Sequence, residues 1–243
     1  MAASIAGIAP GVRIVAVRVS DGDPGDVAGI GRVAEGIRWA AGPGRAQVIN
    51  VSLVIGVDDG RVRAAVAQAV RRGVVVVAAA GNDPARVVGY PAVYPGVIGV
   101  GAVLSSGAPA SFSAVGPGVD LVAVGDGGTS FSAAFVSGTA ALLRERFPEA
   151  SAAQIAGRLS VTADVGRRLN PYRALTEVDA GSRPPVAAAA TPSSSSLRYD
   201  GDGGRARGRA SWFAGVALGL LVVSASAVAA LGRGRRRRWR PPG

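Results

Sequence analysis

Short runs of β-branched and small apolar residues recur through the first 125 positions. Residues 12–19, 47–53 and 74–79 are apolar runs of strand length, and the last of them is apolar throughout. A run without polar positions is typical of a central strand in a parallel sheet. Residues 97–103 and 121–124 have the same character. The pattern therefore predicts a sheet built from short, buried strands.

Residues 27–41 and 61–72, which lie between these runs, carry apolar positions at helical spacing. The apolar stripe of the first segment contains Ile30, Val33, Ile37 and Trp39. The stripe of the second contains Val62, Ala65, Val66, Ala69 and Val70. Strands that alternate with helices in this way predict an α/β fold, with a parallel sheet flanked by helices.

Two further helices are expected at residues 130–146 and 152–159, and Pro148 separates them. Parallel α/β sheets bind ligands beyond the carboxyl ends of their strands. The segments just past two of these ends are Ser52-Leu53-Val54 and Ala80-Gly81-Asn82. We therefore expect the chemistry of this protein at these two segments.

The composition changes after the predicted domain, which spans residues 1–178. Residues 179–211 are rich in proline, alanine, serine and glycine and are interpreted as a flexible linker. Residues 212–231 hold no charge, and at about 1.5 Å per residue such a segment crosses a hydrocarbon core of about 30 Å. The sequence thus predicts one C-terminal transmembrane helix, followed by an arginine-rich tail at residues 232–243.

The net charge of +11 is concentrated in this C-terminal region. Nine arginines and no acidic residue follow position 204, which leaves +2 for residues 1–204. Six of these arginines follow the predicted membrane helix, so the positive-inside rule places the C-terminus in the cytoplasm and the main domain outside. The tail could instead contact anionic lipid or nucleic acid. Because the charge surrounds a membrane segment, we expect a single-pass protein of the cell membrane and no nucleic-acid partner.

Cysteine and histidine are both absent from the sequence. The absence of cysteine excludes disulfides and thiolate metal sites. The absence of histidine removes the commonest general base of enzymes. No cluster of metal ligands or cofactor motif is recognisable, so neither a metal nor a cofactor is predicted.

A glycine turn that ends at Gly128 leads into the small-residue helix, which Thr129 and Ser130 open. Free backbone N–H groups and the helix dipole favour negative charge there, so Ser130 occupies a suitable position for a nucleophile. The alternative is an ordinary N-cap, in which Thr129 or Ser130 accepts a hydrogen bond from the first turn. Asn82 likewise admits a plainer interpretation, as a left-handed turn residue beside Gly81.

Seven short runs, taken in their order along the chain, resemble the subtilisin-like serine peptidases over roughly residues 7–176. The runs are Gly7-Ile8-Ala9-Pro10, Val48-Ile49-Asn50-Val51-Ser52-Leu53, Ala78-Ala79-Ala80-Gly81-Asn82, Tyr90-Pro91-Ala92-Val93-Tyr94-Pro95, Val97-Ile98-Gly99-Val100-Gly101-Ala102, Phe112-Ser113 with Gly116-Pro117, and Gly128-Thr129-Ser130. A closing run at residues 169–176, a low-complexity linker and one membrane helix complete the layout. This layout is similar to that of the mycosins, the subtilisin-like proteases associated with type VII secretion in actinobacteria.

The resemblance implies a membrane-anchored serine endopeptidase that hydrolyses peptide bonds in peptide or protein substrates. Ser130 would be its nucleophile, and the backbone N–H of Ser130 with the side-chain amide of Asn82 would hold the oxyanion. Substrate binding is implied for Ser52, Leu53, Ala79, Ala80 and Gly81. Type VII secretion components are implied as partners. Calcium is frequent in the family, but no ligand cluster here can be matched residue by residue.

The triad of this family runs Asp, His, Ser along the chain, and its first two members have no counterpart here. Residues 7–19 resemble the segment that follows the histidine helix, so we expect both partners upstream of Met1 and a subtilisin-like sheet that is incomplete at its N-terminal side. Asp21 is a tempting stand-in for the acid, but it falls too late in the fold and is interpreted as a turn residue. Val54 replaces a usual glycine and is expected to crowd an extended substrate.

Two hypotheses of different classes remain open. The chain is the C-terminal portion of a mycosin-like endopeptidase, or it is an inactive pseudoprotease or truncated remnant that acts as a membrane-tethered binding component. The series of downstream motifs favours the first hypothesis, and the missing base favours the second. A missing strand would also leave a sheet edge and an apolar helix face uncovered.

Overall fold

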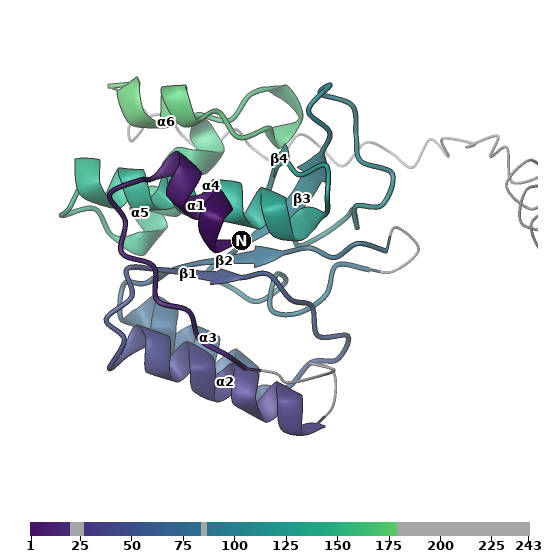
Figure 1. The fold of residues 1–243 in the computed structure, drawn as a ribbon, viewed down its shortest axis with the longest axis vertical. Coiled ribbons are helices and arrows are strands. Elements are labelled where there is room, and N and C mark those ends of the chain that lie inside the picture. The colour runs from purple at the N-terminus through teal and green to yellow at the C-terminus, as the bar shows by residue number, and fades with distance from the viewer. Residues whose placement is uncertain (20–26, 84–86, 179–243) are drawn as a thin grey trace, which may run out of the picture. The chain divides into compact units, whose positions relative to one another are not determined.

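A four-stranded parallel sheet forms the centre of the domain, with the strand order β1-β2-β3-β4 (Figure 1). The structure is a computed structural model and describes residues 1–19, 27–83 and 87–178. The strands are β1 (Val48–Val51), β2 (Val75–Ala79), β3 (Val97–Val103) and β4 (Leu121–Val124). The predictions for β3 and β4 are confirmed at their bounds, and those for β1 and β2 are confirmed with shorter strands. The predicted parallel α/β class is confirmed.

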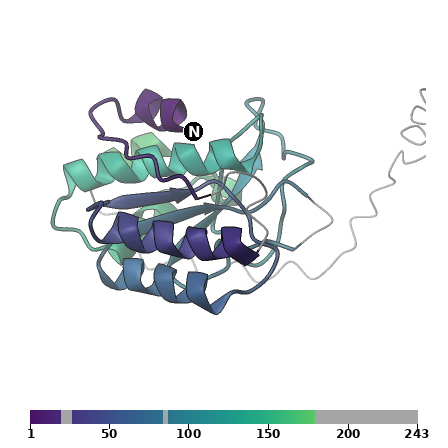
Figure 2. The ribbon, with the colours of Figure 1, turned by 60° about the horizontal axis from the view of Figure 1, so that its bottom comes forward.

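Helices cover both faces of the sheet (Figures 1 and 2). On one face lie α2 (Val27–Ala41) and α3 (Gly60–Arg71), and on the other lie α4 (Thr129–Arg146) and α5 (Ala152–Val161). Strand β2 contributes side chains to the apolar core on both faces of the sheet. Val76 and Ala78 pack toward α2 and α3, while Val75 and Val77 pack toward α4 and α5. This alternation explains why every residue of β2 is buried.

The sequence prediction for α2 is confirmed except at Trp39, which is 44% exposed. Ile30, Val33 and Ile37 are buried against the sheet, at a spacing that keeps them on one helix face. Trp39 lies only two positions after Ile37, which turns it about 200° around the axis of a helix with 3.6 residues per turn. Its placement on the buried stripe was therefore wrong.

The start of α3 is held by Asp59, whose carboxylate accepts hydrogen bonds from the backbone N–H groups of Arg61 and Val62 at 2.8 and 3.3 Å. The Arg61 guanidinium also donates to this carboxylate. These contacts, that of the Arg61 side chain first, lower the pKa of Asp59 to about 2. Asp59 thus acts as a charged N-cap.

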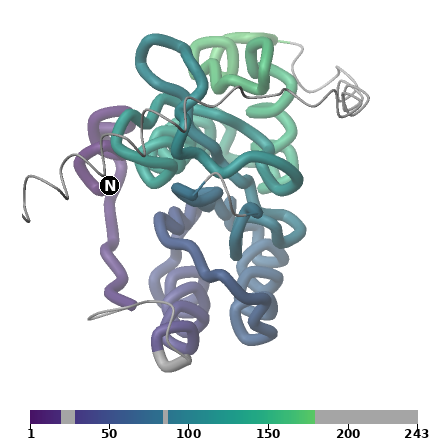
Figure 3. The backbone as a smooth tube through the Cα atoms, turned by 90° about the vertical axis from the view of Figure 1, so that its right-hand side faces the viewer, coloured from purple at the N-terminus to yellow at the C-terminus, as the bar shows by residue number. Residues whose placement is uncertain are grey.

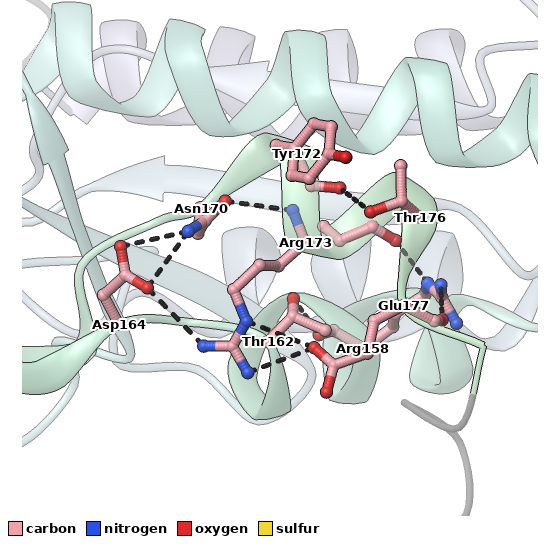
Figure 4. A network of polar contacts seen from close by, with 9 residues as sticks. Arg158, Thr162, Asp164, Asn170, Tyr172, Arg173, Thr176 and Glu177 are labelled. Atoms are coloured by element: carbon pink, nitrogen blue, oxygen red, sulfur yellow. Dashed lines mark hydrogen bonds and ion pairs between the residues drawn. The ribbon is translucent and has the colours of Figure 1, made fainter.

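Two short helices were not expected from the sequence. Helix α1 (Ala2–Ile8) packs on α4, where Gly138 permits a close approach: a Cβ there would lie 2.9 Å from the Cβ of Ile8. Helix α6 (Pro171–Thr176) begins at Asn170, whose side chain accepts a hydrogen bond from the Arg173 N–H. A network of polar contacts joins α6 to the 3₁₀ turn Val165–Arg167 and to α5 (Figure 4).

The predicted strand at residues 12–19 is an extended segment that pairs with no strand of the described residues. It runs between α1 and α2, apart from the sheet (Figure 3). Val17 and Val19 rest on α2 at Gly36, where a Cβ would lie 3.2 and 2.6 Å from their Cγ1 atoms. The strand prediction was wrong because an apolar run becomes a strand only where a neighbour supplies the ladder hydrogen bonds.

Several predictions fall outside the described residues: the linker at 179–211, the transmembrane helix at 212–231, the tail at 232–243 and Asp21. Within residues 1–19, 27–83 and 87–178, none of the helices has the length and apolar character needed to cross a membrane.

Candidate active site

Ser52, Asn82 and Ser130 come together at the carboxyl edge of the sheet. Ser52 directly follows β1, Asn82 follows β2 after two residues, and Ser130 lies in the first turn of α4. Three segments that are distant in the sequence meet there because parallel strands end at the same edge. The expectation that chemistry-bearing residues gather beyond the ends of β1 and β2 is in agreement with this arrangement.

Ser130 and Ser52 exchange hydrogen bonds. The Ser130 hydroxyl donates to the carbonyl oxygen of Ser52, and the Ser52 hydroxyl donates to the carbonyl oxygen of Ser130, each at 3.2 Å. A backbone carbonyl is a weak proton acceptor, so this contact orients the Ser130 oxygen and does not ionise it. Since the chain contains no histidine, Ser130 is a neutral hydroxyl in this structure.

Asn82 caps α4 from a distant loop. Its Oδ1 accepts hydrogen bonds from the backbone N–H of Thr129 at 2.8 Å and from the Thr129 hydroxyl at 2.9 Å. The residue at the N-cap position is Gly128, which makes no side-chain cap. The alternative that Thr129 or Ser130 is an ordinary N-cap is therefore wrong. The alternative of a left-handed turn at Asn82 is also wrong, because among the described residues only Arg45 and Arg167 have positive φ without being glycine.

Two hydrogen-bond donors at this edge have no partner among the residues that the structure describes: the backbone N–H of Ser130 and Nδ2 of Asn82. The identity of Nδ2 follows from its neighbour, because Oδ1 must be the atom that accepts from an N–H group. Gly128 makes room for this amide, since a Cβ there would lie 3.0 Å from Nδ2, and its φ of 130° also favours glycine. A pair of unpaired donors beside a hydroxyl can stabilise an oxyanion.

Two consecutive hydrogen bonds link Ser52 to Ser137 of α4 through Asn50 of β1. The Ser137 hydroxyl donates to Oδ1 of Asn50 at 3.0 Å, and Nδ2 of Asn50 donates to the Ser52 hydroxyl at 2.8 Å. Sequence reasoning missed Thr129, Asn50 and Ser137 as members of the site. A signal was present for Asn50, which is the one polar residue inside the apolar strand β1.

The residues predicted for substrate binding differ in their accessibility. Ser52, Leu53 and Gly81 are partly exposed, while Ala79 and Ala80 are buried. Backbone groups of Ala80 are already bonded, since its N–H donates to Val100 and its carbonyl accepts from Gly89. Ala79 and Ala80 therefore support the site from inside the core, and the reachable surface is formed by the other three residues.

Val54 is 37% exposed and lies between Gly81 and Gly89. Its two methyl groups are 3.7 and 2.3 Å from the positions that a Cβ would take at these glycines. The Val54 side chain thus occupies space that two glycines leave open beside the site.

None of the carboxyl or guanidinium groups whose pKa is shifted lies in this site. Burial raises the pKa of Asp120, which accepts a hydrogen bond from Gly99 in β3, and burial lowers the pKa of Arg144 near the far end of α4. The described part of the chain holds no cluster of three histidine, cysteine or acidic residues able to bind a metal. The site's chemistry therefore rests on one hydroxyl and neutral donors.

Comparison with known proteins places this geometry in context. The family model described as Subtilase family matches residues 1–183. Alkaline elastase YaB of Bacillus sp. strain YaB is 35% identical over 195 residues, which is 74% of this chain and 50% of the relative. Subtilisin DY of Bacillus licheniformis is 35% identical over 198 residues, 74% of this chain and 71% of the relative. The chain thus spans half to about seven tenths of these proteins.

Solved structures of mycosins resemble the described domain. MycP1 with the N-terminal propeptide removed is 34% identical with a TM-score of 0.59, and the match covers 69% of this chain and 71% of that one. MycP1 from Mycobacterium smegmatis is 31% identical with a TM-score of 0.55, covering 65% and 59%. MycP3 protease from the type VII (ESX-3) secretion system is 31% identical with a TM-score of 0.56, covering 61% and 58%.

Proposed function

This chain belongs to the subtilase family, and from that premise we propose that it acts as a membrane-anchored serine endopeptidase of the mycosin type, with Ser130 as its nucleophile. One observation carries the proposal. Ser130 lies in the first turn of α4, directly after Thr129, which donates to Asn82 Oδ1, and within the described part of the chain neither the Ser130 N–H nor Asn82 Nδ2 has a hydrogen-bond partner. Family membership implies that the substrates are peptides or proteins.

In the proposed reaction, Ser130 Oγ attacks the carbonyl carbon of a peptide bond and the carbonyl oxygen becomes an oxyanion. The two unpaired donors receive this oxyanion, and the N-terminal end of the α4 dipole adds to its stabilisation. In subtilisin, removal of the corresponding side-chain donor lowers turnover by about 10²–10³-fold. The two hydrogen bonds that Thr129 donates to Asn82 Oδ1 fix the side-chain amide, which leaves Nδ2 available for the oxyanion before substrate arrives.

The proposed reaction also needs a group that takes the proton from Ser130. The 243 residues contain no histidine, and Ser130 donates to the Ser52 carbonyl. In subtilisin, loss of the histidine costs about 10⁶-fold in turnover. The general base of the proposed peptidase therefore comes from outside these residues, and the purified chain alone is expected to be nearly inert.

A fluorophosphonate probe tests the proposal, because it reacts with an activated serine and not with an ordinary hydroxyl. The full chain is labelled in its native membrane and the adduct is located by mass spectrometry. We expect the adduct on Ser130, its loss in Ser130→Ala and its retention in Ser160→Ala, which removes an exposed serine on α5. A native-membrane sample without an adduct on Ser130 would contradict the proposal.

A second candidate function is that of a membrane-tethered pseudoprotease, which binds a peptide or a secretion component and does not cleave it. The missing histidine and the Ser130–Ser52 hydrogen bonds favour this alternative. The labelling experiment separates the two functions, since a pseudoprotease leaves Ser130 unmodified in the native membrane.

We extend the proposal to the location of the protein. The uncharged segment 212–231 and the arginines on both sides of it support a single-pass anchor in the cell membrane, with the peptidase domain extracytoplasmic and the C-terminus cytoplasmic. The similarity to MycP1 and MycP3 supports type VII secretion components as partners.

A further inference from the structure

Three backbone segments form a frame around the side chain of Val54 at the carboxyl edge of the sheet. They are residues 52–55, which follow β1, residues 80–82, which follow β2, and residues 89–90. Ile55 and Tyr90 exchange backbone hydrogen bonds at 2.8 and 2.9 Å. Gly89 donates its N–H to the carbonyl of Ala80 at 3.2 Å. Because these bonds tie the segments together, the side chain inside the frame determines how much space remains there.

Two glycines contribute no side chain to the inside of the frame. A Cβ at Gly89 would lie 2.3 Å from one methyl carbon of Val54, and a Cβ at Gly81 would lie 3.7 Å from the other. Gly89 is buried, and Gly81 has a φ of 122°, which favours glycine. The methyl groups of Val54 therefore fill the space that both glycines leave free.

The frame adjoins the two candidate oxyanion donors. Asn82, whose Nδ2 is one of them, directly follows Gly81. Ser130, whose N–H is the other, donates its hydroxyl to the carbonyl of Ser52, which lies two residues before Val54. A peptide that Ser130 attacks would therefore place its carbonyl group next to the frame.

The position of this carbonyl group determines which substrate side chain meets Val54. In a peptide, the carbonyl carbon is bonded at about 1.52 Å to the Cα of the same residue. The side chain of the acyl residue, which is the residue whose carbonyl is attacked, thus begins two bonds from the carbonyl carbon. Val54 is 37% exposed beside the donors. The side chain of the acyl residue would therefore contact the Val54 methyl groups.

The frame is apolar around Val54. Its other residues besides Ser52 and Asn82 are Leu53, Ile55, Ala80, Gly81, Gly89 and Tyr90, none of which is charged. The Cβ of Ala114 is also near, since it would lie 3.7 Å from a Cβ at Gly81. A charged side chain would lose hydration in this frame without gaining a partner from it, so the frame favours an apolar side chain.

We infer that Val54 restricts the acyl residue of the substrate to alanine or glycine. A larger side chain would have to displace the Val54 methyl groups, one of which already contacts the backbone of Gly89. The bonds that tie the three segments together oppose a widening of the frame. The inference rests on the proposed peptidase function for the presence of a peptide at Ser130. The pseudoprotease alternative, which also binds a peptide, carries the same restriction.

Fluorescent tetrapeptides that end in a free carboxylate test the inference against the full chain in detergent micelles. The carboxylate takes the place of the oxyanion on the two donors, and the N-terminus of α4 favours its negative charge. Each peptide has three alanines followed by glycine, alanine, leucine or phenylalanine, and binding is followed by fluorescence anisotropy. We expect saturable binding that is at least tenfold tighter for the peptides ending in glycine and alanine. One methylene group is worth about 10–200-fold in an apolar pocket.

Substitutions show whether Val54 sets this preference. Val54→Gly removes both methyl groups and should strengthen binding of the phenylalanine peptide at least tenfold, and Val54→Ala should strengthen it to a smaller extent. Val57→Gly is the matched control, because Val57 lies in the same loop, is 57% exposed and is not part of the frame. It should leave the preference unchanged. Urea unfolding checks that the variants remain folded, and Val54→Ala keeps the test decisive if Val54→Gly does not.

Three results would overturn the inference. They are the absence of saturable binding for all of the peptides, equal affinities for the alanine and phenylalanine peptides, and a preference that both Val54 variants leave unchanged. Because the peptides bind without a chemical step, their affinities depend on the frame whether or not Ser130 reacts.

The two proposals fail in different ways. A fluorophosphonate adduct on Ser130 together with equal peptide affinities would support the peptidase and refute the restriction by Val54. A preference for alanine and glycine without an adduct would support the restriction in a pseudoprotease and contradict the peptidase.

Discussion

The replacement of Asn82 by alanine is expected to destabilise the domain through the loss of a helix cap that lies far away in the sequence. Oδ1 of Asn82 accepts from both the N–H and the hydroxyl of Thr129, 47 residues along the chain. Thr129 is 1% exposed, so water cannot replace the acceptor without a local opening. Asn82→Ala therefore leaves two donors of one residue unpaired.

The magnitude follows from these two bonds. The loss of a helix cap costs about 1 kcal/mol, and a buried hydroxyl that loses its acceptor costs about 1–2 kcal/mol. The free energy of unfolding should therefore fall by about 2–3 kcal/mol. At about 2–4 °C per kcal/mol for a domain of this size, the melting temperature should fall by about 4–12 °C.

Asn82→Asp is the matched variant that separates the cap from the oxyanion donor. It keeps an acceptor for Thr129 and places a negative charge at the N-terminus of α4, which is favourable. Its stability should lie within about 1 kcal/mol of the wild type, while its reaction with the fluorophosphonate should be lost together with Nδ2.

Urea unfolding of the full chain in detergent, followed by circular dichroism, measures both variants. Equal midpoints for Asn82→Ala and the wild type would refute the assigned cap. Equal losses in Asn82→Ala and Asn82→Asp would refute the division of roles between Oδ1 and Nδ2.

Two further predictions concern other parts of the chain. Asp59→Ala should lower the melting temperature at pH 7. The folded pKa of Asp59, about 2, lies below the ordinary value of about 3.9, so its stabilisation is present above pH 4 and is lost as the pH falls toward 2. The difference in melting temperature from the wild type should therefore shrink over that range, and a difference independent of pH would contradict the charged cap. Because the chain contains no cysteine, its orientation in the membrane can be tested with single cysteine variants and a membrane-impermeant maleimide applied to intact cells. The reagent should label Ser195→Cys and not Gly243→Cys, and the reverse pattern would contradict the proposed orientation.

The secondary structure was predictable wherever its cause is local. The apolar runs at β3 and β4 and the 3.6-residue period of α2 and α3 identify these elements at nearly their full length. Trp39 and the segment 12–19 show the limit of such patterns. Trp39 was assigned to the apolar stripe because its side chain is apolar, although its angular position on the helix directs it away from that stripe. Residues 12–19 have the composition of a β-strand, but no described strand lies beside them to form the backbone hydrogen bonds of a sheet.

The candidate site was predictable as a set of residues and not as a set of contacts. Ser52 and Asn82 were predicted as site residues because each follows a predicted strand, and Ser130 because it begins a predicted helix. In a parallel sheet these strand ends and helix starts lie at the same edge. The order of residues along the chain gave no sign that the helix cap belongs to Asn82, or that Ser137 supports Ser52 through Asn50, since these bonds join residues 47 to 87 positions apart.

The sequence by itself determined the parallel α/β class, the nucleophile candidate and the absence of a histidine base, because periodicity, order and composition need no coordinates. Only the tertiary structure decided that Asn82 caps α4 through Thr129, and which donors near Ser130 have no partner among the described residues. Hydrogen-bond satisfaction and strand pairing depend on which distant segments become neighbours, and that is settled only when the whole domain packs.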